Sequence, residues 1–426
     1  MSYPNYFWQQ SNNWFEALRS LGISTPRDPN DGLSAGGYFL PINIDPNNQT
    51  RSDARRAYFD PVSGRTNLRV LANSQVTMIN FDNSYGLRAT GVQYYSNGQM
   101  ITVNARREVI LAAGAIHSPQ LLELSGIGQA SILSKLGIRV LQDLPGVGNN
   151  LQDHGLVHVD YSYQVPNIID VETISHNSTI AQHFEREYFA SKSGPWTATP
   201  SQAVAFPSLQ QFASDPSGML SSVTSDITDY LPSNYESTLR AGYARQRDSI
   251  LSELSQSNIP AFENLNNNAG GLDIALMRPF SRGTCHITTT DPFIQPAVDP
   301  RWLVHPFDME IMVQAMLFNQ KILDTPQIQA LQPSYPFVSR NAGREEITNY
   351  LKARVSTEYH YTSTTAMLPR DLGGVVDTNL TVYGTSNLRI VDTGVYPMVP
   401  GAHLQAVAYA VAEKAADLIR AASNSR

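Results

Sequence analysis

Two histidines in the last third of the chain are the residues best suited to acid–base chemistry. His360 lies in the stretch EYHYTSTTAM and His403 in GAHLQ, with 42 residues between them. An unperturbed histidine has a pKa of about 6.5, so its ring can take up or release a proton near neutral pH. A single histidine is more often structural than catalytic. The elements around the pair therefore decide how it is interpreted.

Each of these histidines is followed by a predicted element that could position a reaction site. Residues 388–392, LRIVD, form an apolar strand that ends in Asp392, and ligands of open α/β sheets gather at such carboxyl ends. His403 precedes a long predicted helix, residues 404–422, whose apolar residues follow a helical period. A helix N-terminus carries about half a positive charge, so it favours an anion.

A second strand–helix unit is predicted near the middle of the chain. Residues 109–113, VILAA, form an apolar run typical of a buried strand. Ser118 and Pro119 suit the N-cap and first position of a helix, which the glycines at 126–128 would close. A short helix is expected at 129–137.

Further elements are predicted before this unit. Residues 11–21 fit an amphipathic helix, and Asn97-Gly98 is a hairpin signal. The expected strands lie at residues 68–72, 75–82, 89–95 and 99–105.

The composition excludes several classes of protein. The chain has 426 residues, 42% of them apolar, and a net charge of −7, which argues against nucleic acid as a partner. No apolar run approaches the roughly 20 residues that span a bilayer. The single cysteine, Cys285, excludes an internal disulfide and any multi-cysteine metal site. Sequons at Asn48, Asn177 and Asn379 favour a secretory or extracellular location.

Three patterns suggest chemistry but lack the context it needs. G-x-S-x-G at residues 32–36 follows loop-forming residues instead of a strand, so a serine nucleophile is not expected there. His154 and His158 lie four residues apart, but their surroundings alternate like a strand, and a structural role is the better interpretation. Residues 146–148 carry only two glycines of a dinucleotide fingerprint.

Four stretches in order give the chain a family resemblance. They are GAIHSPQLLELSGIG (114–128), LPGVGNNLQDH (144–154), DPRWLVHPFDMEIM (299–312) and the region 358–418. Together they resemble the glucose–methanol–choline (GMC) family of flavin oxidoreductases, particularly its fungal aryl-alcohol-oxidase-like members. The resemblance implies an α/β and α+β fold, in which part of a Rossmann-like FAD domain is interleaved with a substrate domain of mixed sheet and helices.

The resemblance also implies a division of the chain. Residues 66–150 and 373–426 would belong to the FAD domain, and residues 1–65 and 151–372 to the substrate domain. The family's βαβ unit with G-x-G-x-x-G does not occur in this sequence, whose first residues look like an internal family segment. We therefore expect the chain to need an N-terminal segment carrying that unit, or to self-associate through the surface that the unit would cover.

The family's site residues map onto matching positions here. His360 would be the general base and His403 the second catalytic residue. The residues expected to bind FAD are Val76, Gly114, Asp392, Thr393, Gly394, His403, Leu404 and Gln405. Where the family commonly has His-Pro-x-Gly-Thr, this chain has residues 360–364, HYTST, so the pocket beside the base is expected to differ.

The predicted activity is hydride transfer to FAD from the CH–OH group of a small aromatic or natural-product alcohol. Oxygen or another acceptor would then reoxidise the flavin. Two alternatives stay open at this point. Some fungal relatives catalyse ring closure, so the two histidines could serve a non-redox cyclase or dehydratase, or the chain could be a binding protein without catalysis.

Overall fold

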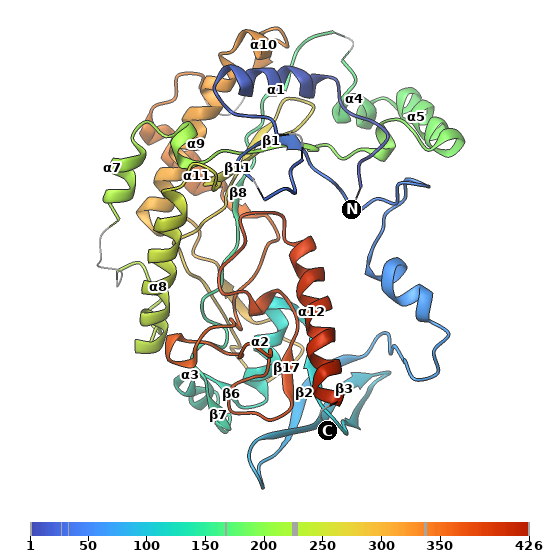
Figure 1. The fold of residues 1–426 in the computed structure, drawn as a ribbon, viewed down its shortest axis with the longest axis vertical. Coiled ribbons are helices and arrows are strands. Elements are labelled where there is room, and N and C mark those ends of the chain that lie inside the picture. The colour runs from blue at the N-terminus through green and yellow to red at the C-terminus, as the bar shows by residue number, and fades with distance from the viewer. Residues whose placement is uncertain are drawn as a thin grey trace.

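The computed structural model describes residues 2–26, 28–32, 34–166, 168–223, 229–335 and 339–424. Their elements gather in two regions that the chain enters in turn, one around a six-stranded sheet and one around the long helix α12 (Gln405–Asn424) (Figure 1). The fold is mixed α/β, as the sequence predicts.

The six-stranded sheet is antiparallel throughout. Its strands, in order across the sheet, are β1 (Gly36–Phe39), β10 (Ala203–Phe206), β11 (Phe262–Asn266), β12 (Leu272–Leu276), β8 (Gly155–Val157) and β16 (Ser356–Thr357). Both faces are covered, because Ala203 and Ala205 of β10 pack into the largest core while Val204 and Phe206 pack into a smaller one. The longer helices with residues in the largest core are α1 (Gln10–Ser20), α8 (Ser237–Leu254), α9 (Pro306–Leu323) and α11 (Arg344–Arg354), and the short helices α6 (Leu209–Phe212), α7 (Pro216–Ser221) and α10 (Pro326–Gln329) add further residues to it.

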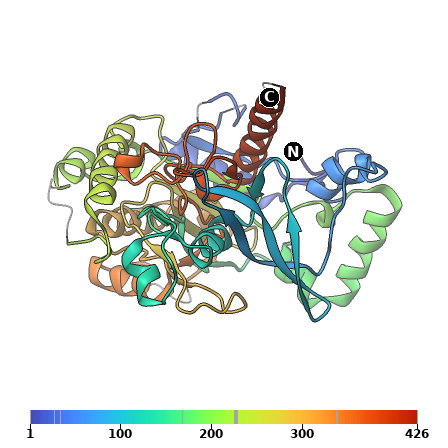
Figure 2. The same cartoon turned by 90° about the horizontal axis from the view of Figure 1, so that it is seen from below.

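The second region joins distant parts of the chain. The strands β2 (Gln75–Asp82), β3 (Arg88–Ser96) and β4 (Gln99–Asn104) form an antiparallel sheet. This sheet lies on the side of the molecule that faces the viewer in Figure 2. Strands β5 (Val109–Leu111) and β17 (Leu388–Ile390) pair in parallel. They share one core with α2 (Gly114–Leu124) and α12. The two strands predicted from apolar runs are therefore neighbours.

The remaining elements are short or lie at the edges. They are η1 (Arg55–Phe59), η2 (Asp60–Val62), β6 (Ile127–Gly128), α3 (Ala130–Lys135), β7 (Gln142–Asp143), β9 (Ser162–Tyr163), α4 (Val171–His176), α5 (Ser178–Ser191), η3 (Pro195–Thr197), β13 (Thr284–His286), β14 (Ala297–Asp299), β15 (Pro333–Ser334), η4 (Arg370–Leu372) and η5 (Thr393–Val395). No helix within the described ranges combines the length and the apolarity needed to cross a membrane.

One strand prediction was wrong and another was right only in part. Residues 68–72 form no strand, and Leu68, Val70 and Leu71 are exposed, since no neighbouring strand pairs with them. The run 109–113 forms only a short strand, and Ile110 is 43% exposed. Val109 and Leu111 are buried while Ile110 lies on the opposite, exposed face, so β5 is buried on one face only.

Helix α2 begins earlier than predicted, at Gly114, and Pro119 lies inside it. A proline has no N–H, so it leaves the carbonyl of Ala115 without its usual helical donor. The hydroxyl of Thr364 donates to that carbonyl at 2.6 Å. Ser118, predicted as the N-cap, instead donates from Oγ to Asp392 Oδ2 at 2.6 Å. Contacts with the C-terminal part of the chain thus replace the local start signal.

Candidate active site

The fold brings His360 and His403 together. His360 follows β16, the edge strand of the six-stranded sheet, and His403 lies two residues before α12. Their ring centroids are 5.5 Å apart. Both side chains keep some exposure, 16% and 31%, so an external molecule can reach them.

A buried carboxylate of the six-stranded sheet lies against His403. Glu263 is on β11, where it pairs with Ala275 of β12, and its side chain has no exposed surface. Its oxygens are 2.9 and 3.2 Å from His403 Nε2. Burial raises the pKa of Glu263 to about 8, despite the opposing charge of His403.

The pKa of His403 is itself set by opposing effects. Burial disfavours the charged ring, but attraction and hydrogen bonding to Glu263, with Glu358 nearby, outweigh burial and raise the pKa to about 9. His403 therefore carries a positive charge at neutral pH, in front of the positive end of α12.

A second carboxylate, that of Glu358, lies among three histidines. Its Oε1 is 3.7 Å from His403 Nε2, and its Oε2 is 3.3 Å from His154 Nδ1 and 3.4 Å from His360 Nδ1. Burial opposes its ionisation, but contacts with His154 and His360 outweigh burial and lower its pKa. Glu358 is thus an anion that joins the two predicted catalytic residues.

The ring of His154, for which a structural role is expected from the sequence, belongs to this cluster. Nδ1 of His154 lies 2.9 Å from Nδ1 of His360, and the His154 side chain is fully buried. Glu358 was also missed, although it lies two residues from His360, a spacing that places two side chains on one face of an extended segment. Glu263 carried no sequence signal, since only the pairing of β11 places it here.

The segment after His360 departs from the family pattern and is held by main-chain contacts. Ser363 occupies the usual glycine position and adopts φ 74°, a left-handed conformation that favours glycine. Its N–H donates to the carbonyl of Thr393 at 3.2 Å, and Thr393 Oγ1 donates to the carbonyl of Tyr361 at 2.9 Å. The amide of His360 donates to Asp153 Oδ1 at 3.0 Å. Burial raises the pKa of Asp153 to about 6.

Asp392 lies at the end of β17 as predicted, but its carboxylate contacts protein groups. Oδ2 accepts from the amide of Gly114 and from Ser118, and Oδ1 accepts from the amide of Gly394. Its side chain therefore holds the start of α2 against η5. A direct contact between Asp392 and a cofactor stays a prediction, as do contacts from Gly114, Thr393 and Gly394.

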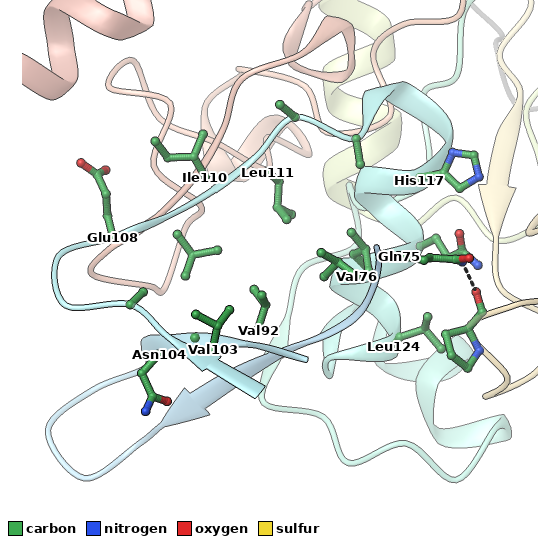
Figure 3. Close-up of a pocket in the computed structure, with 18 of the residues that line it drawn as sticks. Gln75, Val76, Val92, Val103, Asn104, Glu108, Ile110, Leu111, His117 and Leu124 are labelled. Atoms are coloured by element: carbon green, nitrogen blue, oxygen red, sulfur yellow. Dashed lines mark hydrogen bonds between the residues drawn. The ribbon is translucent and has the colours of Figure 1, made fainter. Parts of the chain in front are cut away.

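Two cavities flank this framework. One, of about 790 Å³, lies between the β2–β4 sheet and the β5–α2 unit, and Val76, Leu111, His117 and Leu124 are among the side chains that line it (Figure 3). The other, of about 640 Å³, is lined by His403, by Gln405 in the first turn of α12, and by Tyr38 and Phe206. Leu404 instead packs into the core, so only its backbone could contact a ligand.

Comparison with known proteins identifies the family. Sequence models for GMC oxidoreductases match residues 3–156 and 279–412. The chain is 32% identical to a dehydrogenase, xptC, of Emericella nidulans, covering 98% of this chain and 68% of that protein. The chain belongs to the GMC oxidoreductase family.

Other relatives agree with this assignment. A GMC oxidoreductase family protein, Mala s 12, of Malassezia sympodialis is 34% identical over 98% of this chain and 66% of its own length. An FAD-dependent oxidoreductase from Chaetomium thermophilum superposes with a TM-score of 0.95 at 32% identity, covering 99% of this chain and 74% of that one. A fungal aryl-alcohol oxidase superposes with a TM-score of 0.91 at 31% identity, covering 98% of this chain and 72% of that one. The chain therefore spans about two thirds of the length of these curated relatives.

The cofactor of this GMC chain is FAD, and the residues present fit its flavin end. The first turn of α12 opens on the cavity beside His403. The amides of a helix N-terminus suit the electron-rich part of a reduced flavin. The larger cavity offers a mainly aliphatic wall to a flat ring, at Val76, Val92, Val103 and Leu111. Among the described residues that line it there is no lysine or arginine.

Proposed function

We propose that this GMC chain carries the catalytic residues of an FAD-dependent oxidoreductase that oxidises the CH–OH group of a small alcohol. The observation that supports it most strongly is the pairing of His360 and His403, with ring centroids 5.5 Å apart. A base and a cationic donor at one carbon–oxygen group are what alcohol oxidation requires.

His360 serves as the base. Its Nδ1 faces Glu358 and His154, which leaves Nε2 to accept the proton of the substrate hydroxyl. The contacts of Nδ1 orient the ring, much as a carboxylate orients the histidine of a catalytic triad. When bound, FAD supplies the acceptor for the hydride that leaves the substrate carbon.

His403 stabilises the oxygen as it loses its proton. Glu263 holds the ring by Nε2, and the raised pKa keeps the ring cationic at neutral pH. A fixed positive charge next to a developing alkoxide lowers the barrier because it needs no reorganisation during the reaction.

The cavity beside His403 favours an aromatic substrate. The rings of Tyr38 and Phe206 stack with centroids 5.7 Å apart, and Phe206 meets His403 edge-on at 6.4 Å. Aromatic walls of this kind pack well against a flat ring. We therefore propose a small aromatic alcohol as substrate, with oxygen or another acceptor completing the cycle.

A second candidate is acid–base catalysis without electron transfer. Burial raises the pKa of Glu263 to about 8, so Glu263 and His403 form a buried pair that shares a proton near neutral pH. An acid and a base in contact could serve a ring closure or a dehydration.

The test adds FAD to the chain with the family's βαβ segment supplied in trans, and follows anaerobic reduction of the bound flavin by an aryl alcohol with stopped-flow absorbance. His360→Ala should slow reduction by about 10²- to 10⁴-fold, the usual contribution of a general base. The control is His183→Ala, on the exposed face of α5. Equal rates in the parent and in His360→Ala would remove His360 from the role of base. Turnover by a colourless protein would favour the second candidate.

A further inference from the structure

Three ligand atoms converge on one point inside the histidine–carboxylate cluster. Nδ1 of His154, Nδ1 of His360 and Oε2 of Glu358 form a triangle with edges of 2.9, 3.3 and 3.4 Å. These three groups lie within a cluster whose atoms could hold a metal ion. The side chains of His154 and Glu358 are 0% and 9% exposed. The triangle is therefore shielded from most competition by water.

Protons alone leave this triangle poorly satisfied. A neutral imidazole carries one N–H, and a proton between the two Nδ1 atoms would leave the carboxylate oxygen without a donor. If both Nδ1 atoms carried protons toward Glu358, two N–H groups would face each other across 2.9 Å. Consistent with this, Glu358 Oε2 is buried and has no hydrogen-bond partner among the described residues. A buried anion in this state is costly.

A single cation would satisfy all three atoms. Ligands about 2.05 Å from one transition-metal ion lie about 2.9 Å apart at a right angle and about 3.3 Å apart at the tetrahedral angle. The observed edges fall at these values. We propose that His154, Glu358 and His360 form a binding site for one divalent transition-metal ion, of the Zn²⁺ or Co²⁺ class. Two imidazoles and one carboxylate select this class over Mg²⁺ and Ca²⁺, which prefer oxygen ligands.

The neighbouring group of Glu263, Glu358 and His403 does not carry the same inference. There the ring nitrogen of His403 donates to Glu263 at 2.9 Å, so a proton already satisfies the shortest contact. Its other ion-pair distance, to Glu358, is 3.7 Å, wider than the about 3.3 Å expected between ligands at the tetrahedral angle. The site therefore takes one ion.

The test uses the full chain, stripped of metal with a chelator and titrated with Co²⁺. We expect the ligand-field absorption of bound Co²⁺ to rise until one equivalent of Co²⁺ has been added. Addition of Zn²⁺ should then displace the Co²⁺ and abolish this absorption. Glu358→Gln and His154→Gln should each weaken Co²⁺ binding at least tenfold. His158→Gln is the matched control, because this histidine lies on the same segment but pairs with Asp273 outside the triangle.

A second measurement separates binding from folding. Zn²⁺ should raise the melting temperature of the parent and of His158→Gln, and not that of Glu358→Gln or His154→Gln. No stoichiometric Co²⁺ signal in the parent, or equal affinity in Glu358→Gln, would overturn the proposal. If one variant fails to fold, the other still tests the site.

With Nδ1 of His360 bound to an ion, the neutral ring would carry its proton on Nε2, so Nε2 could not accept the proton of the substrate hydroxyl. This consequence rests on the proposed function, and Zn²⁺ should then slow flavin reduction in the parent. Metal binding itself does not rest on that function. Co²⁺ absorption without inhibition would support the site and count against His360 as the base.

Discussion

At the scale of single residues, the cluster shifts the pKa values of two glutamates in opposite directions. Glu263 and Glu358 both contact His403, yet burial raises the pKa of Glu263 while contacts with His154 and His360 lower that of Glu358. Carboxyls with opposite shifts are a common feature of catalytic sites, because one can hold a proton while the other orients a base.

Replacing His403 with glutamine is expected to flatten the pH dependence of stability between about pH 6.5 and 9. The pKa of His403 is about 9 in the folded chain and about 6.5 when unfolded. The folded state therefore binds the proton more tightly. This stabilisation is complete below about pH 6.5 and is lost as the pH rises through about 9.

Urea unfolding at about pH 6, 7.5 and 9 measures this effect. From the lowest to the highest pH, the parent should lose about 1–3 kcal/mol more unfolding free energy than His403→Gln. The raised pKa of Glu263 acts with the same sign, and without His403 its carboxyl should stay neutral to higher pH. His183→Gln, on the exposed surface of α5, should behave like the parent. Parallel pH profiles for the parent and His403→Gln would contradict the assigned charge.

At the scale of elements, the start of α2 depends on a residue about 250 positions away. Pro119 removes one helical donor, and Thr364 supplies the replacement at the carbonyl of Ala115. The same segment carries His360 at its start. The contact therefore ties the position of the proposed base to the helix that follows β5.

Thr364→Val should lower the free energy of unfolding by about 1–3 kcal/mol, because it leaves the buried carbonyl of Ala115 without a donor. Equilibrium urea unfolding measures the change. Thr348→Val is the matched control, since its hydroxyl also donates to a carbonyl, that of Arg344, but in an exposed setting. The control should change stability by less than about 0.5 kcal/mol. Equal losses in the two variants would show that the buried setting is unimportant.

At the scale of the whole molecule, the region around the larger cavity exposes much apolar surface. Strand β4 is exposed along its whole length and pairs only with β3 among the described strands. Val103 of β4 and Ile110 of β5 are exposed and line the cavity. An open edge strand beside apolar side chains favours association with another chain.

We expect the isolated chain to bind a hydrophobic dye and to self-associate. Charged substitutions on both sides of the cavity, Val103→Asp with Ile110→Lys, should reduce dye fluorescence and the associated fraction in sedimentation velocity. Phe189→Asp, at an exposed apolar position on α5, is the control and should change neither. A parent chain that stays monomeric and binds no dye would show that this surface does not mediate self-association.

The sequence by itself determined the family, the mixed α/β fold, the helical period of α12 and strand β2, and it predicted the two histidines of the proposed site. These features are local or lie in ordered motifs, so spacing and residue type are enough to find them. The prediction of His360 and His403 required only that two family positions hold histidine.

The tertiary structure alone decided which groups surround those histidines. Glu263 reaches His403 because β11 pairs within the six-stranded sheet, and His154 reaches His360 across 206 positions. Burial then sets their charges, and burial depends on every element that packs around them. The early start of α2 has the same origin, since Thr364 and Asp392 supply distant hydrogen bonds. Such contacts form only when the whole chain folds, so the secondary-structure propensity of the local sequence does not predict them.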